Sequence, residues 1–126
     1  MPASVLLVED SRATRALVVS TLEDLGHIRI VEADNGFAAL KALPASRFDL
    51  IITDINMPEI TGLEIVRFVK THPQYRHIPV LIISTQQAAA DVERGMSLGA
   101  AAYLGKPFQP DQLKAAVQSL LPPAAA

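Results

Sequence analysis

The sequence predicts an α/β fold in which one parallel β-sheet lies between two layers of helices. Five short apolar runs recur along the 126 residues, and segments with helical spacing of apolar residues alternate with them. The runs are nearly continuous, which is typical of strands covered on both faces, whereas strands with one wet face would alternate. Together these observations predict a three-layer arrangement of five strands and five helices.

The predicted strands are the apolar runs that turn-forming or polar residues delimit. They are residues 4–8, 27–33, 49–53, 78–84 and 101–104. In a parallel sheet these strands all point the same way, so their carboxyl ends meet at one edge. In open α/β sheets the functional crevice lies beyond that edge. The residues that follow each run are therefore the first candidates for a site.

Capping signals delimit the first three predicted helices. Ser11 is a good N-cap for the first, and Thr61 with Glu64 has the spacing of a capping box for the third. The other boundary residues are Gly26, Asn35–Gly36, Pro44 and Pro73. The residues expected to face the sheet are Val18, Leu22, Leu25, Ala39, Leu40, Leu43, Val66 and Val69.

The last two helices have different signals. The fourth lies in an Ala-rich segment closed by Gly99, and its weaker pattern consists of Ala88, Val92 and Met96. The fifth starts near Pro110, which the first turn of a helix accepts. Its expected inward residues are Leu113, Val117, Leu120 and Leu121.

Length and composition limit the functional classes. We expect residues 1–121 to form one domain and the tail 122–126, "PPAAA", to fray. The net charge is −2 without any basic run, which argues against direct binding to nucleic acid or to an anionic membrane surface. The chain has no cysteine, no basic leader and no apolar run long enough to span a bilayer, so we expect it in the cytoplasm.

Polar side chains stand at the carboxyl ends of four predicted strands. In chain order they are Glu9, Asp10, Asp54, Ser84, Thr85 and Lys106. Three carboxylates in one cleft repel one another and require a cation. Oxygen ligands without histidine or cysteine suit Mg²⁺, with Mn²⁺ as the alternative ion.

The same rim has the groups that a phosphoryl transfer needs. A divalent cation, the ammonium of Lys106 and the hydroxyl of Ser84 together suit a phosphoryl group. Asp54 ends the middle strand of the set, and an aspartate can accept a phosphoryl group. Asp54 is therefore the candidate phosphoacceptor.

These residues give the sequence a clear resemblance to a known family. Over essentially its whole length it resembles the receiver domain of bacterial two-component response regulators, of the stand-alone kind found in chemotaxis. The matching residues are Glu9–Asp10, Asp54, "NMPEITG" at 56–62, Ser84, Tyr103 and "KPF" at 106–108. The resemblance implies a flavodoxin-like, doubly wound sheet with strand order 2-1-3-4-5.

The resemblance also implies roles for the acidic residues. Asp54 would accept a phosphoryl group from a sensor histidine kinase or a phosphotransfer protein. Asp10, Asp54 and the backbone carbonyl of Asn56 would bind Mg²⁺, and Glu9 would assist through water. The chain would not be an enzyme beyond catalysing its own phosphorylation and dephosphorylation.

Three further residues would form the switch. By resemblance, Lys106 would hold a phosphoryl oxygen and precede a cis bond to Pro107. Ser84 would close over the phosphoryl group, and Tyr103 would turn inward behind it. The fourth helix, fifth strand and fifth helix would then present a changed face to a protein output partner. The oligomeric state expected is a monomer or a weak phosphorylation-dependent dimer.

Two positions depart from the common pattern of the family. Thr85, after the switch hydroxyl, is usually a smaller residue, and Gly105, before the lysine, is usually a larger one. These differences concern the rates of the reactions and leave the identity of the site unchanged.

In the third helix, Gly62 is expected to allow close packing at the helix start.

Other classes of function remain open at this point. The chain could be a receiver excised from a longer response regulator or a hybrid kinase. An aspartate-nucleophile Mg²⁺ phosphatase is suggested by Asp54 and Asn56 after a strand, but an asparagine cannot perform the acid–base step. A dinucleotide-binding module is disfavoured because no glycine-rich loop follows the first strand.

Overall fold

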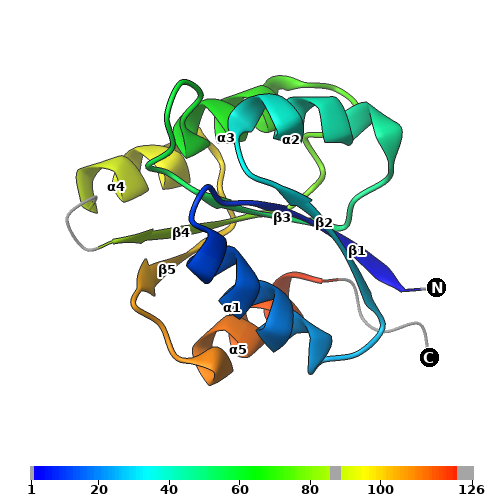
Figure 1. The fold of residues 1–126 in the computed structure, drawn as a ribbon. Coiled ribbons are helices and arrows are strands. Elements are labelled where there is room, and N and C mark those ends of the chain that lie inside the picture. Colours follow the sequence, from blue (N-terminus) through cyan, green and yellow to red (C-terminus); the bar gives the residue numbers. More distant parts are fainter. Residues whose placement is uncertain (1, 86–88, 122–126) are drawn as a thin grey trace.

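Five parallel strands form one sheet in the order β2-β1-β3-β4-β5, as the resemblance implies (Figure 1). The structure is a computed structural model that describes residues 2–85 and 89–121. The strands are β1 (Ala3–Val8), β2 (Ile28–Ala33), β3 (Leu50–Asp54), β4 (Val80–Thr85) and β5 (Ala102–Lys106). The tail that we expected to fray, residues 122–126, lies outside the described residues.

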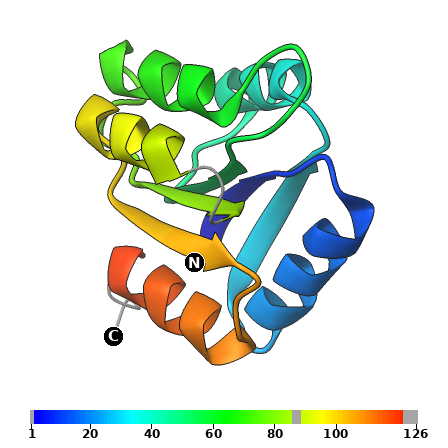
Figure 2. The ribbon, with the colours of Figure 1, turned by 90° about the vertical axis from the view of Figure 1, so that its left-hand side faces the viewer.

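Helices cover both faces of the sheet, which confirms the three-layer prediction (Figures 1 and 2). One face carries α2 (Gly36–Ala42), α3 (Gly62–Thr71) and α4 (Ala89–Leu98); the other carries α1 (Arg12–Glu23) and α5 (Pro110–Leu120). Each layer of helices packs against alternate residues of the strands. For example, Leu6 packs in the core on the side of α2, α3 and α4, and Leu7 packs in the core on the side of α1 and α5. Both are fully buried.

The predicted helix starts agree with the structure. The Asn35 side chain accepts a hydrogen bond from the amide of Ala38 at 2.8 Å. Thr61 and Glu64 form the expected capping box, with the two reciprocal bonds at 3.3 and 3.1 Å. These bonds satisfy amides that the first turn of a helix leaves without partners.

The fifth strand was predicted too short. The apolar run ends at Leu104, but the strand continues through Gly105 and Lys106, which pair in register with Ser84 and Thr85. Backbone pairing does not depend on side-chain polarity, so a strand can extend beyond its apolar run. For the same reason β3 includes Asp54, which follows the apolar run 49–53.

The prediction for Met96 was wrong. Val92 is buried as expected, but Met96 is exposed, and Ala88 lies outside the described residues. The packed side of α4 passes through Gly95 instead. A Cβ at Gly95 would lie 2.4 Å from the Cδ1 atom of Ile82, so α4 approaches the sheet at this glycine. Among the described helices, none is both long and apolar enough to cross a membrane.

Candidate functional site

Three acidic side chains meet at the carboxyl edge of the sheet, as the strand directions predict. Glu9 and Asp10 follow β1, and Asp54 is the last residue of the neighbouring β3. Their carboxylate oxygens lie within 4.8 Å of one another. Glu9 and Asp54 are buried, whereas Asp10 is exposed. The sequence-predicted acidic rim is therefore one compact cluster.

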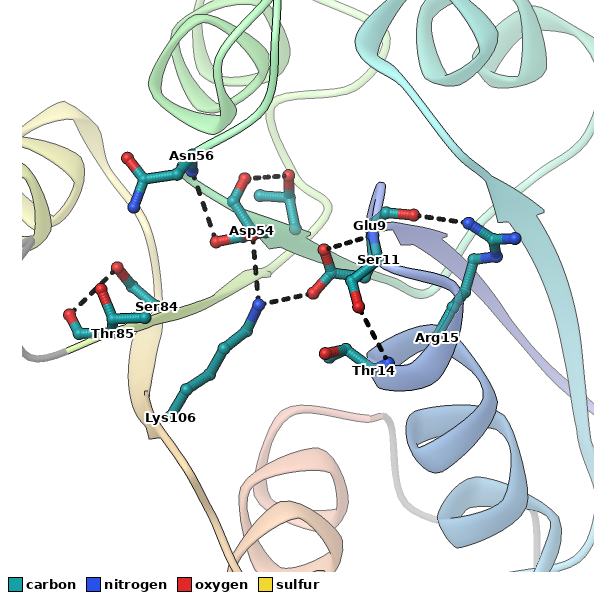
Figure 3. A network of polar contacts seen from close by, with 10 residues as sticks. Glu9, Ser11, Thr14, Arg15, Asp54, Asn56, Ser84, Thr85 and Lys106 are labelled. Atoms are coloured by element: carbon teal, nitrogen blue, oxygen red, sulfur yellow. Dashed lines mark hydrogen bonds and ion pairs between the residues drawn. The ribbon is translucent and has the colours of Figure 1, made fainter.

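Lys106 reaches into this cluster from the end of β5 (Figure 3). Its Nζ atom donates to Glu9 Oε1 at 2.6 Å and to Asp54 Oδ2 at 3.1 Å. The peptide bond from Lys106 to Pro107 is cis, as the resemblance implies. One ammonium thus lies between two buried carboxylates in the unmodified protein.

The pKa values of Glu9 and Lys106 show how the cluster shares its charge. Burial raises the pKa of Glu9; the hydrogen bond from Lys106 opposes this, and the charge of Asp54 raises it further. Burial alone would lower the pKa of Lys106, but the carboxylates of Glu9 and Asp54 raise it overall. Three carboxylates face one ammonium, so the site retains excess negative charge. That excess favours the binding of a cation.

Hydrogen bonds hold both the side chain and the carbonyl oxygen of Asp54. Asp54 Oδ1 accepts a hydrogen bond from the amide of Asn56 at 3.3 Å. The hydroxyl of Thr53 donates to the Asp54 carbonyl oxygen at 2.9 Å. At Gly62, a Cβ would stand 2.0 Å from that same carbonyl oxygen, so α3 begins directly against the strand end. The expected close packing at Gly62 is confirmed.

Ser84 and Tyr103 lie at different depths. Ser84 is fully buried, and its hydroxyl donates to the carbonyl oxygen of Thr85 at 3.3 Å (Figure 3). Tyr103 is 41% exposed on β5. Its hydroxyl oxygen lies 2.9 Å from the point where a Cβ on Gly105 would stand. Thus Ser84 lies at the strand end beside the cluster, while Tyr103 lies along the outer strand over Gly105.

Arg15 makes two contacts at the site that were not predicted from the sequence. Its Nη1 donates to the carbonyl oxygen of Glu9 at 2.9 Å, and its Nε donates to Glu32 Oε1 at 3.2 Å. Arg15 lies on α1 and Glu32 on β2, so the contact depends on how these elements pack. The only signal in the sequence is a basic residue one turn after the N-cap Ser11.

The donors at this rim fit a hard divalent cation. The three clustered carboxylates offer only oxygen atoms, and Asn56 contacts the cluster through its amide, which donates to Asp54 Oδ1. Mg²⁺ and Mn²⁺ prefer such ligands and retain part of their water shell. The exposed position of Asp10 leaves the cluster open to solvent on one side. The residues present therefore fit the predicted ion.

The fold and the acidic cluster define a receiver-type α/β signalling domain. A family profile described as "Response regulator receiver domain" matches residues 5–118. The chain belongs to this family and has the phosphoreceiver signalling role of two-component systems. Such domains are signalling proteins and not enzymes in the ordinary sense.

Curated relatives and solved structures agree with this assignment. The chemotaxis protein CheY of Pseudomonas aeruginosa is 32% identical over 116 residues, which cover 92% of this chain and 94% of the relative. The structure of the chemotaxis response regulator CheY4 of Vibrio cholerae is 38% identical, with a TM-score of 0.88; the match covers 96% of this chain and all of the other.

A second similar structure contains a metal ion. It is the receiver domain of a sensor histidine kinase from Pseudomonas aeruginosa, described with a magnesium ion coordinated in the active-site cleft. It is 25% identical, has a TM-score of 0.85, and the match covers 95% of this chain and 98% of the other.

Proposed function

We propose that this chain is a phosphorylation-dependent switch in which Asp54 accepts a phosphoryl group. The donor would be a phosphohistidine on a sensor histidine kinase or a phosphotransfer protein. The observation that carries the proposal is the position of Asp54. Its buried carboxylate ends the central strand beside two other carboxylates, and the ammonium of Lys106 lies 3.1 Å away.

The proposed reaction is a transfer between two nucleophiles. An oxygen of the Asp54 carboxylate attacks phosphorus, a new P–O bond forms, and the P–N bond of the phosphohistidine breaks. The electron pair of that bond returns to the imidazole nitrogen, which leaves. Lys106 then balances charge on the phosphoryl oxygens. Later attack by water breaks the P–O bond, releases inorganic phosphate and restores the Asp54 carboxylate.

The cation would neutralise charge that builds up on the phosphoryl oxygens. Asp10, Asp54 and the carbonyl of Asn56 would hold Mg²⁺, or alternatively Mn²⁺, with Glu9 assisting through water. The family match and the clustered oxygen donors support this ligand set. Burial of Glu9 keeps its carboxylate on the inner side of the cluster.

The output would be read on the face formed by α4, β5 and α5, which lie side by side (Figure 2). A phosphoryl group adds negative charge and strong acceptors beside Ser84 and Lys106. Drawing the Ser84 hydroxyl toward it would open space behind β4 that Tyr103 could enter. Ser84 of β4 pairs with Gly105 of β5, which supports a direct effect of a Ser84 movement on β5. A protein partner that reads this face would complete the switch.

Several broader expectations remain predictions. They are the domain bounds 1–121, a cytoplasmic location, a monomer or weak phosphorylation-dependent dimer, and the lack of direct contact with nucleic acid or membrane. The net charge of −2 without a basic run supports the last of these.

Phosphorylation is tested by incubating the protein with acetyl phosphate and Mg²⁺ and measuring its intact mass. We expect the wild type to gain one phosphoryl group and Asp54→Asn to gain none. Asp34→Asn is the matched control, because Asp34 is an exposed aspartate directly after the edge strand β2. Equal labelling of Asp54→Asn and the control would exclude Asp54 as the acceptor.

The output face is tested by amide NMR with and without beryllofluoride. We expect shifts that extend from the site into α4, β5 and α5, beyond the immediate neighbours of Ser84 and Lys106. Shifts confined to residues that touch Asp54 would show that this face is not the output surface.

A second candidate is a receiver that forms part of a longer regulator or hybrid kinase. The similar structure from a sensor histidine kinase favours it, because the match covers 98% of that receiver. The coding sequence on both sides of the 126 residues distinguishes the two. Membership of the receiver family removes the support for the aspartate-nucleophile phosphatase.

A further inference from the structure

We propose that Arg15 is a positioning residue for the metal site: it fixes the peptide between Glu9 and Asp10 and thereby directs the Asp10 carboxylate. The inference rests on the proposed function, since Asp10 needs a fixed direction only if the site binds a divalent cation. It adds a residue of α1 that touches neither the ion nor the phosphoryl group.

The guanidinium of Arg15 contacts both the end of β1 and the edge strand β2. Figure 3 shows the first of these contacts, with Glu9. Its Nη1 donates to the Glu9 carbonyl oxygen at 2.9 Å, and its Nε donates to Glu32 Oε1 at 3.2 Å. The side chain of Arg15 is 18% exposed, whereas that of Glu32 is 49% exposed. Glu32 therefore orients the guanidinium from the solvent side, and the second donor reaches inward to the peptide.

The other groups of Glu9 are already held. Its amide donates to the carbonyl oxygen of Ala33 at 3.0 Å. Its Oε1 accepts from Lys106 at 2.6 Å, and its Oε2 accepts from the amide of Ser11 at 3.2 Å. The carbonyl is the remaining polar group of this residue, and Arg15 holds it. The other three bonds fix Glu9 itself, and the bond from Arg15 acts directly on the Glu9–Asp10 peptide.

The position of the Asp10 carboxylate depends on that peptide more than the positions of the Glu9 and Asp54 carboxylates do. Glu9 and Asp54 are buried and share the Lys106 ammonium. Asp10 is exposed, and within residues 2–85 and 89–121 its carboxylate makes no hydrogen bond or ion pair. The backbone therefore sets the position from which its carboxylate extends, and no side-chain contact within the described residues adds to that. A group that fixes the preceding peptide acts on Asp10 as an outer-shell partner acts on a metal ligand.

Neither stability nor charge alone explains this arrangement. In the Arg15–Glu32 ion pair the Glu32 side chain is half-exposed, so the pair contributes modestly to folding stability. A positive charge beside the cluster would weaken cation binding if it acted only through the electric field. Positioning has the opposite effect, because it favours the ligand geometry that the cation requires. Removal of the guanidinium therefore distinguishes the two roles. The affinity for the cation should rise if Arg15 acts only through its charge and fall if Arg15 positions Asp10.

The test is the affinity of the unphosphorylated protein for Mg²⁺, followed by amide NMR titration. We expect Arg15→Gln to raise the Kd on the order of tenfold. Arg12→Gln is the matched control: Arg12 is an exposed arginine on the first turn of the same helix. This control removes the same charge and should leave the Kd unchanged or slightly lower. Binding by Arg15→Gln as tight as that of the wild type, or tighter, would overturn the proposal.

Two further variants keep the proposal testable if Arg15→Gln does not fold. Arg15→Lys retains the charge but loses the two fixed donors of the guanidinium, so it should weaken Mg²⁺ binding as Arg15→Gln does. Glu32→Gln leaves the Glu9 carbonyl contact in place and should weaken binding less. Wild-type affinity in Arg15→Lys would contradict a positioning role.

The metal-free protein supplies an independent measurement. The amide resonance of Asp10 should move in Arg15→Gln and Arg15→Lys and stay in place in Arg12→Gln. An unmoved Asp10 resonance in both Arg15 variants would also overturn the proposal. Failure of the wild type to bind Mg²⁺ at all would instead contradict the proposed function, so the two failures are distinguishable.

Discussion

The ammonium of Lys106 and the carboxylate of Glu9 form the shortest ion pair among the described residues, at 2.6 Å, although 97 positions separate them in the sequence. This contact means that Lys106 already has partners before any phosphoryl group arrives. An ammonium has three N–H donors, so two are engaged here and one remains. Under the proposed function, Lys106 would add a phosphoryl oxygen to the contacts that it already makes with Glu9 and Asp54.

The raised pKa of Glu9 predicts a specific dependence of stability on pH. The unfolded chain releases this proton near the ordinary value of 4.5, whereas the folded protein retains it to higher pH. The folded state thus binds more protons in that window, and its stability falls as pH rises through it. We expect the free energy of unfolding of the wild type, relative to Glu9→Gln, to decrease as pH rises from 4.5 through the raised pKa.

Urea unfolding of both proteins without divalent metal measures this difference. The comparison cancels the titration of groups that the two proteins share. A difference that increases with pH would show that Lys106 dominates Glu9 and lowers its pKa instead.

Asp10→Asn should stabilise the metal-free protein while weakening its binding of Mg²⁺. The substitution removes one of three carboxylates whose oxygens lie within 4.8 Å of one another. Because Asp10 is exposed, the gain should be at most about 1 kcal/mol. Urea unfolding and Mg²⁺ titration provide the two measurements. Asp34→Asn should change neither, and a less stable Asp10→Asn would contradict repulsion within the cluster.

Gly62→Ala should destabilise the fold and impair phosphorylation together. A Cβ at this position would stand 2.0 Å from the Asp54 carbonyl oxygen, so α3 or the end of β3 must move. Overpacking of this kind costs about 3 kcal/mol. Gly26→Ala is the control, because Gly26 has a φ of +68° but no heavy atom within 4 Å of the added Cβ. It should cost about 1 kcal/mol and leave phosphorylation unchanged.

Thr85→Ala should shorten the lifetime of the phosphorylated protein severalfold. Thr85 ends β4 and pairs with Lys106 in the ladder, so under the proposed function it adjoins the residue that would hold the phosphoryl group. Its bulk should hinder the water that attacks the acyl phosphate. Decay of the phosphorylated mass after removal of acetyl phosphate gives the lifetime. Thr85→Val preserves the shape and should behave as the wild type does, so equal acceleration in both variants would exclude a steric role.

Gly105→Ala should displace the ring of Tyr103. The Tyr103 hydroxyl lies 2.9 Å from the position of the added Cβ, and the end of a flexible side chain yields more easily than the strand does. Contacts between the Tyr103 ring and residue 105 in nuclear Overhauser spectra should be present in the wild type and lost in the variant. Their persistence would show that the strand moves and not the ring.

Much of the site could be predicted because its residues stand at strand ends. Apolar runs identified the five strands, and parallel pairing then brought Glu9, Asp54 and Lys106 to one edge. This reasoning needs only the direction of each strand and the length of its buried part. It does not need the conformation of any long side chain.

The features that escaped prediction depend on tertiary packing. The reach of Arg15 to the Glu9 carbonyl depends on how α1 lies over β1 and β2, which no local pattern encodes. The error at Met96 has a similar origin. In a helix rich in small residues several faces can pack, and the close approach at Gly95 selected a face that excludes Met96.

The place of β5 as the last strand in the chain has a consequence for biosynthesis. Glu9, Asp10 and Asp54 all leave the ribosome before Lys106, so an unfinished chain holds the carboxylates without the ammonium that lies between two of them. Such a chain lacks the group that would steady a phosphoryl oxygen, and its edge strand β4 has no neighbour on that side. Under the proposed function, a truncated product therefore has the acceptor carboxylate of Asp54 without the ammonium that would balance charge on the phosphoryl group.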